Sequence, residues 1–212
     1  MRLLIAIPTL DYMYFGFVES LMKLLMYLKD DGVDFDVDFR SGTLVYHARE
    51  NICKKAMAEG YSHVLWIDAD MIFDETVVDD LLFCGKPYVA GVFHARRPPH
   101  LSCLFSSLEP IERFSMDTYP SEPFEIAGSG FGLVLMETDM IRKVWDKFGT
   151  CFHPTKELGE DLAFCYRVHQ CGLTMFADPS VRVGHVGHIT IYPESEEEWR
   201  GKVANIERIK RC

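Results

Sequence analysis

The chain has 212 residues and a mass of 24.4 kDa, and its 48% hydrophobic and 25% charged residues are typical of a globular protein, which excludes the disordered and fibrous classes. The length predicts a single domain over residues 1–212. Twenty-two Lys and Arg residues against thirty-two Asp and Glu residues give a formal charge of −10, which repels a phosphate backbone and disfavours nucleic acid as a partner.

The first half of the chain alternates strand and helix patterns. An apolar run at residues 2–7, closed by Pro8, predicts a buried strand, and alternating apolar and acidic side chains at residues 33–39 predict a half-exposed one. This order predicts an α/β fold of Rossmann-like layout, with a mostly parallel central sheet flanked by helices. Further strands are predicted at residues 63–67 and 88–93, and helices at residues 12–29, 44–60 and 76–83.

Prolines interrupt this pattern in the second half. Residues 96–124 combine Pro98, Pro99, Pro110, Pro120 and Pro123 with short apolar pieces, which predicts a long functional loop. After the loop we predict strands at residues 128–136 and 174–183, helices at residues 139–148 and 160–171, and a charged helical tail from Ser195 onward.

No targeting segment and no membrane span are predicted. The apolar run before Pro8 has about five residues, fewer than a signal peptide needs. The apolar stretch at residues 12–28 contains Glu19 and Lys23 at the spacing of a helical ion pair, which predicts an amphipathic helix. The seven cysteines are odd in number and form no CxxC, so we expect free thiols in a reducing compartment and a cytoplasmic location.

The strand predicted at residues 63–67 is followed by Asp68, Ala69 and Asp70. Because side chains alternate in an extended chain, both carboxylates are expected on the same side, at the carboxyl end of the sheet where α/β folds bind ligands. Two carboxylates so placed suit Mg²⁺ or Mn²⁺, which complete their shells with water and substrate phosphates. The alternative is a solvated turn with two capping aspartates.

A second chemistry uses the same DxD pattern. Phosphatases of the haloacid dehalogenase type use its first Asp as a nucleophile, but their motif follows the first strand and continues with Thr two residues on. Here the motif follows the third predicted strand, and Ile72 occupies the position of that Thr. These departures disfavour phosphotransfer through an aspartyl phosphate.

Several short features follow one another in an order that covers most of the chain: the first strand ending in Ile7, Pro8 and Thr9, the helix with Arg49 and Asn51, the DxD at Asp68 and Asp70, the pair Glu160 and Asp161, and a downstream His. In these features the chain resembles the glycosyltransferases of the GT-A fold. The resemblance implies a nucleotide-sugar donor, usually a UDP-sugar, with Mn²⁺ or Mg²⁺ between the DxD and the diphosphate. It also implies a nucleotide-binding half at residues 1–95 and an acceptor and sugar half at residues 96–212.

In its small size and its free cysteines, the chain is also similar to the amino-terminal domain of virus-encoded enzymes that glycosylate capsid protein. That closer resemblance would place the chain in a host cytoplasm.

The GT-A resemblance implies roles for individual residues near the amino terminus. The loop with Pro8, Thr9, Asp11 and Tyr12 would hold the nucleotide base, Tyr12 by stacking on uracil and Asp11 or Thr9 by hydrogen bonding. Arg49 would contact the nucleotide or the DxD. A plain turn, a helix start and a solvated arginine explain the same residues without a ligand.

A third protein ligand for the metal is expected from the loop at residues 184–188, which offers His185 and His188. Imidazole binds Mn²⁺, and flanking glycines let such a loop approach a metal closely. We favour His185 because it directly follows the last predicted strand. A histidine satisfied by ordinary packing is the alternative.

Gly128, Ser129 and Gly130 open a glycine-rich segment that differs from a dinucleotide fingerprint. The third glycine, Gly132, comes one residue too early for GxGxxG, and a strand is predicted where a helix is required. We expect these residues to let the backbone approach the transferred sugar or the acceptor. A β-bulge is the alternative.

Glu160 and Asp161 begin a predicted helix and are the candidate catalytic residues. In inverting members of the family a carboxylate at this place removes the acceptor's proton, and in retaining members it orients the sugar or the acceptor. A helix N-terminus lowers a carboxylate pKa and weakens a base, so the sequence leaves the stereochemistry open. The resemblance to the viral enzymes leans toward retention.

The compact basic cluster at residues 94–100, HARRPPH, is expected to hold the diphosphate or an acidic acceptor, or else to be a solvated loop. We therefore predict a metal-dependent transfer of a hexosyl or deoxyhexosyl group from a UDP-sugar to a hydroxyl of a glycan or glycoprotein. The alternatives are a non-catalytic module that binds nucleotide-sugars and a DxD phosphohydrolase.

Overall fold

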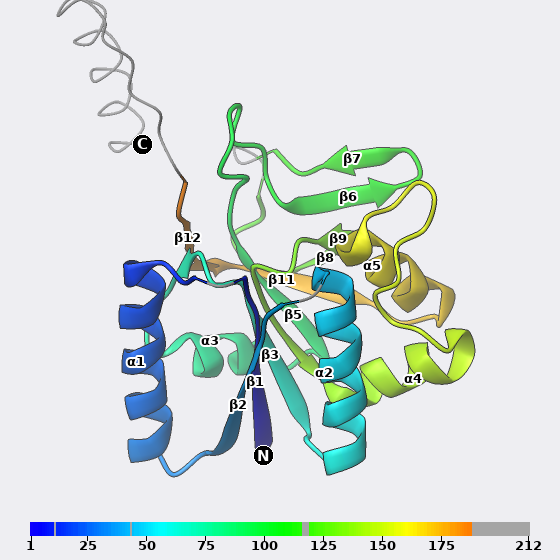
Figure 1. The fold of residues 1–212 in the computed structure, drawn as a ribbon. Coiled ribbons are helices and arrows are strands. Elements are labelled where there is room, and N and C mark those ends of the chain that lie inside the picture. Colours follow the sequence, from blue (N-terminus) through cyan, green and yellow to red (C-terminus); the bar gives the residue numbers. More distant parts are fainter. Residues whose placement is uncertain (11, 43, 116–118, 188–212) are drawn as a thin grey trace, which may run out of the picture.

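The structure is a computed structural model that describes residues 1–10, 12–42, 44–115 and 119–187. Its centre is a seven-stranded sheet (Figure 1). Five strands run in one direction, and β10 (Leu133–Glu137) and β8 (Phe124–Ile126) run antiparallel to their neighbours. The predicted α/β fold with a mostly parallel sheet is confirmed. The strand order is β2 (Asp34–Arg40), β1 (Arg2–Pro8), β3 (His63–Ile67), β10, β5 (Tyr88–Val92), β11 (Met175–Arg182) and β8.

Helices cover both faces of the sheet (Figure 1). One face carries α1 (Phe15–Asp30) and α3 (Val77–Phe83), and the other carries α2 (Val45–Glu59), α4 (Thr138–Phe148) and α5 (Glu160–Gln170). The predicted ion pair between Glu19 and Lys23 forms on α1 at 2.9 Å. Within the described ranges, every helix is too short or too polar to cross a lipid bilayer.

Strand β1 shows why the sheet needs a helix layer on each face. Leu3, Ile5 and Ile7 are fully buried in the cluster that contains the inner side chains of α1 and α3. Leu4 and Ala6 are fully buried in the opposite cluster, against α2, α4 and α5. A strand buried on both faces has a continuous apolar sequence. Because β1 and β3 are parallel neighbours, the loops that follow them meet at one edge of the sheet.

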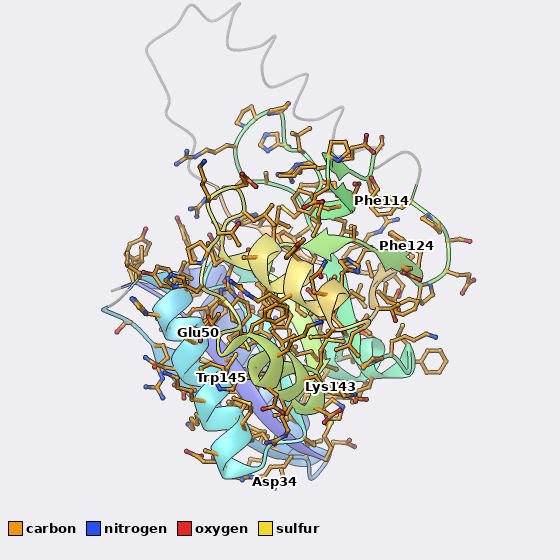
Figure 2. All side chains as sticks on the ribbon, turned by 90° about the vertical axis from the view of Figure 1, so that its right-hand side faces the viewer. Asp34, Glu50, Phe114, Phe124, Lys143 and Trp145 are labelled. Atoms are coloured by element: carbon orange, nitrogen blue, oxygen red, sulfur yellow. The ribbon has the colours of Figure 1, made fainter. Side chains whose placement is uncertain are left out.

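The loop predicted at residues 96–124 contains structure that the sequence analysis missed. Strands β6 (Leu104–Leu108) and β7 (Ile111–Arg113) pair antiparallel, and β9 (Gly128–Ser129) joins β6 to complete a separate three-stranded sheet. Phe114 and Phe124 pack edge to face beside it, with ring centroids 5.0 Å apart (Figure 2). Strands of three to five residues give too few periods for a pattern to be recognised between prolines.

The prediction of one continuous strand at residues 128–136 is wrong. The segment divides into β9 and β10, which belong to different sheets. The turn between them returns to the main sheet, where the carbonyl of Gly132 accepts a hydrogen bond from the Asp68 N–H at 3.1 Å.

Two short strands were not predicted. β4 (Met71–Ile72) follows the DxD and pairs antiparallel with β12 (Gly184–His185). Next to this pair, the Val186 N–H donates to the carbonyl of Asp70 at 2.8 Å. Strands of two residues have no periodicity to read, yet this pair brings His185 to the DxD. His188 and the helical tail predicted from Ser195 lie outside the described residues.

Glu50 on α2 fastens the segment after α4 to the same helix layer (Figure 2). Its buried carboxylate accepts hydrogen bonds from the Thr150 hydroxyl at 2.8 Å and from the N–H groups of Cys151, at 2.7 Å, and Phe152. Arg167 of α5 donates to the Cys151 carbonyl of this segment at 2.8 Å. The segment thereby holds the Phe152 ring in the core.

Glu50→Ala is expected to lower the free energy of unfolding by about 3 kcal/mol, because it leaves buried donors without an acceptor. Urea unfolding followed by circular dichroism measures the change. Glu157→Ala, in an exposed loop, is the control and should stay within about 0.5 kcal/mol of the parent protein. Equal stability of the two variants would mean that Glu50 does not fasten the segment.

Candidate active site

A cavity of about 270 Å³ opens at the carboxyl edge of the sheet. An adjoining hollow of about 110 Å³ shares part of its wall. Because the lining comes from separate segments of the chain, the fold itself assembles the site. The cavity brings together nine residues predicted from the sequence, which are Pro8, Thr9, Tyr12, Arg49, Asp68, Ala69, Asp70, Glu160 and Asp161.

Leu10, Tyr14, Val45 and Arg96 complete the lining of the cavity. Leu10 belongs to the predicted base-binding loop, whereas Tyr14 and Val45 were not predicted. Leu10 and Val45 also line the adjoining hollow, together with Ala48. The available signal was the presence of apolar side chains in the loops and helix starts that follow the strands at the ligand-binding edge. Arg96 lies in the basic cluster at residues 94–100.

Among the described residues, four predicted ones lie outside the lining: Gly128, Ser129, Gly130 and His185, the last of which lies beside Asp70. Gly128 and Ser129 are buried in β9, where a Cβ on Gly128 would lie 3.2 Å from the Cβ of Cys165. Gly130 packs against the ring of Phe93, which would lie 3.1 Å from an added Cβ. The approach of residues 128–130 to a sugar stays a prediction. Asp11 belongs to the undescribed part of the chain.

The DxD forms a turn rather than the extended segment that the alternation argument assumed. The Met71 N–H donates to the Asp68 carbonyl at 3.2 Å, which closes a four-residue turn between β3 and β4. The Tyr14 N–H donates to the carbonyl of Ala69 at 3.3 Å and joins this turn to the loop after β1. The expected extended conformation is therefore wrong, although Asp68 and Asp70 still line one cavity.

Arg49 is the buried centre of the site. Its side chain is 2% exposed, and its Nη2 lies 3.2 Å from Asp68 Oδ1 and 3.4 Å from Asp161 Oδ1. Its Nε and Nη1 have no hydrogen-bond partner among the described residues. Aromatic faces surround the cation instead, which stabilises a desolvated guanidinium. The rings are those of Phe131, Phe152 and Trp66, with centroids 5.0, 5.7 and 5.9 Å from the guanidinium carbon.

Negative charge at the cavity exceeds what Arg49 compensates. Burial raises the pKa of Asp68 to about 7, and the charges of Asp161 and Asp70 add to the rise, while Arg49 opposes it. A carboxylate with such a pKa favours the uptake of a positive charge, either a proton or a metal cation.

The contribution of Asp68 to the stability of the metal-free protein is expected to be lost as pH rises from about 4 to about 7, because Asp68 binds a proton more tightly in the folded than in the unfolded chain. Asp68→Asn removes this contribution. The variant should therefore melt a few degrees higher than the parent at pH 8 and differ little from it at pH 4. Thermal unfolding in EDTA at both pH values tests this, and a lower melting temperature of the variant at pH 8 would contradict it.

Asp161 and Asp68 both form an ion pair with Arg49. The Oδ2 of Asp161 also accepts a hydrogen bond from the Phe131 N–H at 3.2 Å. Burial nevertheless raises the pKa of Asp161 against the effect of Arg49, and the neighbouring Glu160 adds to the rise. The pKa of Asp161 is thus raised, opposite to the lowering expected from the helix N-terminus, and burial is the largest cause. A raised pKa makes Asp161 a stronger base.

Asp70 lies where the DxD turn, the loop after β5 and strand β12 meet. Its Oδ2 accepts a charge-assisted hydrogen bond from Arg96 Nη1 and lies 3.4 Å from His185 Nε2. The Nδ1 of His185 donates to the carbonyl of His94 at 2.7 Å, which fixes the ring. The hydrogen bond with Asp70 raises the pKa of His185. The structure thus places His185 beside the DxD, as the sequence predicted.

The residues at the cavity fit a divalent cation only in part. In the described segments, no group of three or more His, Cys, Asp or Glu side chains is arranged to hold a metal ion. Asp68 faces Arg49, whereas Asp70 faces Arg96 and His185. The two DxD carboxylates nevertheless suit Mn²⁺ or Mg²⁺, since these ions take few protein ligands and fill their shells with water and phosphate.

No protein-family model matches the chain, and no curated protein matches it in sequence. Solved structures do resemble it. Protein A197 from STIV is 15% identical, with a TM-score of 0.56 over 92% of this chain and 99% of that one. The catalytic domain of Drosophila β1,4-galactosyltransferase 7 in complex with xylobiose is 11% identical, with a TM-score of 0.54 over 93% and 79% of the two chains.

A UDP-glucose pyrophosphorylase in complex with UDP-glucose is 10% identical, with a TM-score of 0.50 over 84% of this chain and 90% of that one. The chain shares its fold with this galactosyltransferase domain and this pyrophosphorylase. At these identities the likeness concerns the fold alone. The closer resemblance to capsid-glycosylating viral enzymes stays a prediction.

Proposed function

We propose that the chain is a metal-dependent glycosyltransferase that moves a hexosyl or deoxyhexosyl group from a UDP-sugar to a hydroxyl of a glycan or glycoprotein. The observation that carries the proposal is the cavity where both DxD carboxylates, Arg49 and the first residues of α5 meet. The fold supports the proposal. The pyrophosphorylase structure with this fold contains UDP-glucose, and a mutant of the Drosophila galactosyltransferase 7 has been solved with manganese, UDP-Gal and xylobiose.

The nucleotide base is assigned to the hollow beside the main cavity. Pro8, Leu10 and Val45 offer apolar walls there, and Thr9 offers a polar group. The ring of Tyr12 is 61% exposed and lines the main cavity, so it is available for stacking. Apolar walls with few polar groups are typical of sites that bind a flat heterocycle.

The diphosphate is assigned to the DxD end of the cavity. A Mn²⁺ or Mg²⁺ ion held by Asp68 and Asp70, with His185 beside them, would supply the positive charge that stabilises the departing diphosphate. Arg49 holds Asp68 and Asp161 in place through its two ion pairs and limits their mutual repulsion.

The acceptor is assigned to the wall formed by Glu160 and Asp161. A carboxylate with a raised pKa accepts the proton of the attacking hydroxyl in an inverting reaction, or orients the reactants in a retaining one. The sequence-based leaning toward retention stays a prediction. The anomeric configuration of the product, read by NMR, decides between the two.

Incubation with a panel of UDP-sugars and candidate acceptors, with Mn²⁺ and with EDTA, tests the proposal through release of UDP. We expect release that requires Mn²⁺. A thermal-shift screen of nucleotide-sugars selects the donor beforehand, because a bound ligand stabilises the folded state by mass action.

The other candidate functions give different products in the same assay. A non-catalytic module shows a thermal shift and no UDP, and a phosphohydrolase releases inorganic phosphate. With pyrophosphate added, a nucleotidyltransferase, which the pyrophosphorylase with this fold represents, converts UDP-glucose and pyrophosphate to UTP and glucose 1-phosphate. Any of these results in place of UDP release would refute the glycosyltransferase assignment.

A further inference from the structure

Arg96 covers Asp70 from the open side of the cavity. Its Nη1 donates to Asp70 Oδ2, although the two residues lie 26 positions apart in the sequence. The Arg96 side chain is 43% exposed and that of Asp70 is 15% exposed. The cationic half of this ion pair therefore faces solvent at the wall of the cavity, while the carboxylate half is largely enclosed.

The two arginines at the cavity are held in different ways. Arg49 is enclosed by aromatic rings, so packing fixes its position. Among the described residues, Asp70 is the one ion-pair partner of the Arg96 guanidinium. Its backbone is packed, since a Cβ on Gly187 would lie 3.1 Å from the Arg96 carbonyl oxygen. The end of the Arg96 side chain can therefore change partner while its backbone stays in place.

Arg96 and a divalent cation compete for the same oxygen of Asp70. A cation bound by this carboxylate needs the lone pairs that Arg96 uses, and it repels the guanidinium. A displaced Arg96 remains tethered at the cavity, where a nucleoside diphosphate would offer new negative charge. Guanidinium groups pair with phosphate oxygens through two parallel hydrogen bonds, which makes the diphosphate a favourable new partner.

We infer that Arg96 is an exchangeable counter-ion, which neutralises Asp70 in the metal-free protein and turns to the donor's diphosphate when a divalent cation takes Asp70. The inference rests on the proposed function, because it needs a cation and a nucleoside diphosphate at this cavity. It also predicts that Mn²⁺ and UDP strengthen each other's binding through Arg96, since such coupling is reciprocal.

Isothermal titration of the metal-free protein with Mn²⁺ alone, and of the Mn²⁺-saturated protein with UDP, tests the inference. Arg96→Ala is expected to bind Mn²⁺ alone about tenfold more tightly and UDP about tenfold more weakly than the parent, within the usual range of coupling between two ligands. Arg96→Gln keeps most of the aliphatic chain and should change both affinities in the same directions. The control Arg142→Ala, at an exposed arginine on α4 outside the cavity lining, should leave both within about twofold.

Unchanged or weaker binding of Mn²⁺ by both Arg96 variants would overturn the counter-ion role. Unchanged binding of UDP would overturn the role toward the diphosphate. Asp70→Asn combined with Arg96→Ala should abolish the gain in Mn²⁺ affinity, and a gain that persisted would place the metal elsewhere and overturn the inference.

Failure of the proposed function gives a different result. A parent protein that binds neither Mn²⁺ nor UDP would overturn that function and the inference together. Mn²⁺-dependent UDP release by the parent, with no change of affinity in the Arg96 variants, would overturn the inference alone.

Discussion

Asp70→Ala is expected to reduce Mn²⁺-dependent release of UDP by at least about a hundred- to a thousand-fold, the scale seen when one preorganised electrostatic group is removed. The reason is that Asp70 supplies one of the two carboxylates at the turn after β3. The fold should survive, because Arg96 is left partly exposed to water and His185 keeps its hydrogen bond to the backbone. Steady-state release of UDP and the melting temperature, measured on the same preparation, check both statements.

Asp74→Ala is the matched control, because Asp74 is an exposed aspartate shortly after β4 and outside the cavity lining. It removes the same charge from the same region and should leave the rate within about twofold of the parent, as surface changes away from a site usually do. Full activity of Asp70→Ala, or equal losses in both variants, would refute the assignment of the DxD.

The central strands were predictable because burial leaves a clear sequence pattern. β1 and β3 are covered on both faces and appear as continuous apolar runs. β2 alternates because Phe35 and Val37 are partly buried, while Asp36 between them is exposed. The direction of a strand leaves no such pattern. The antiparallel direction of β10 between β3 and β5 could therefore not be predicted from the sequence.

The site was predictable where it depends on the ends of strands and helices. Asp68 follows β3 and Glu160 begins α5, so their meeting at one edge follows from the fold class. Contacts between distant side chains were not predictable in this way. The pairing of Arg96 with Asp70 depends on the conformation of a loop, and the aromatic enclosure of Arg49 depends on how three separate segments pack.

Arg49→Met is expected to lower the free energy of unfolding by about 3 kcal/mol at pH 8, because it leaves charges near the core uncompensated. The loss is at the low end for a buried ion pair, since the Asp68 and Asp161 side chains are 35% and 27% exposed. Here two carboxylates, those of Asp68 and Asp161, lose their shared counter-ion. Arg142→Met, an exposed arginine on α4, is the control for the loss of a positive charge. Urea unfolding of the metal-free proteins at pH 5 and pH 8 measures the effect.

The loss in Arg49→Met should be smaller at pH 5 than at pH 8. Burial already raises the pKa of both carboxyl groups, and removal of the cation raises them further, so protons partly replace Arg49 in acid. Adding Asp161→Asn to Arg49→Met removes one stranded charge and should restore part of the stability at pH 8. If the loss were equal at both pH values and the second substitution had no effect, Arg49 would stabilise the core through its contacts with the aromatic rings and not through the two carboxylates.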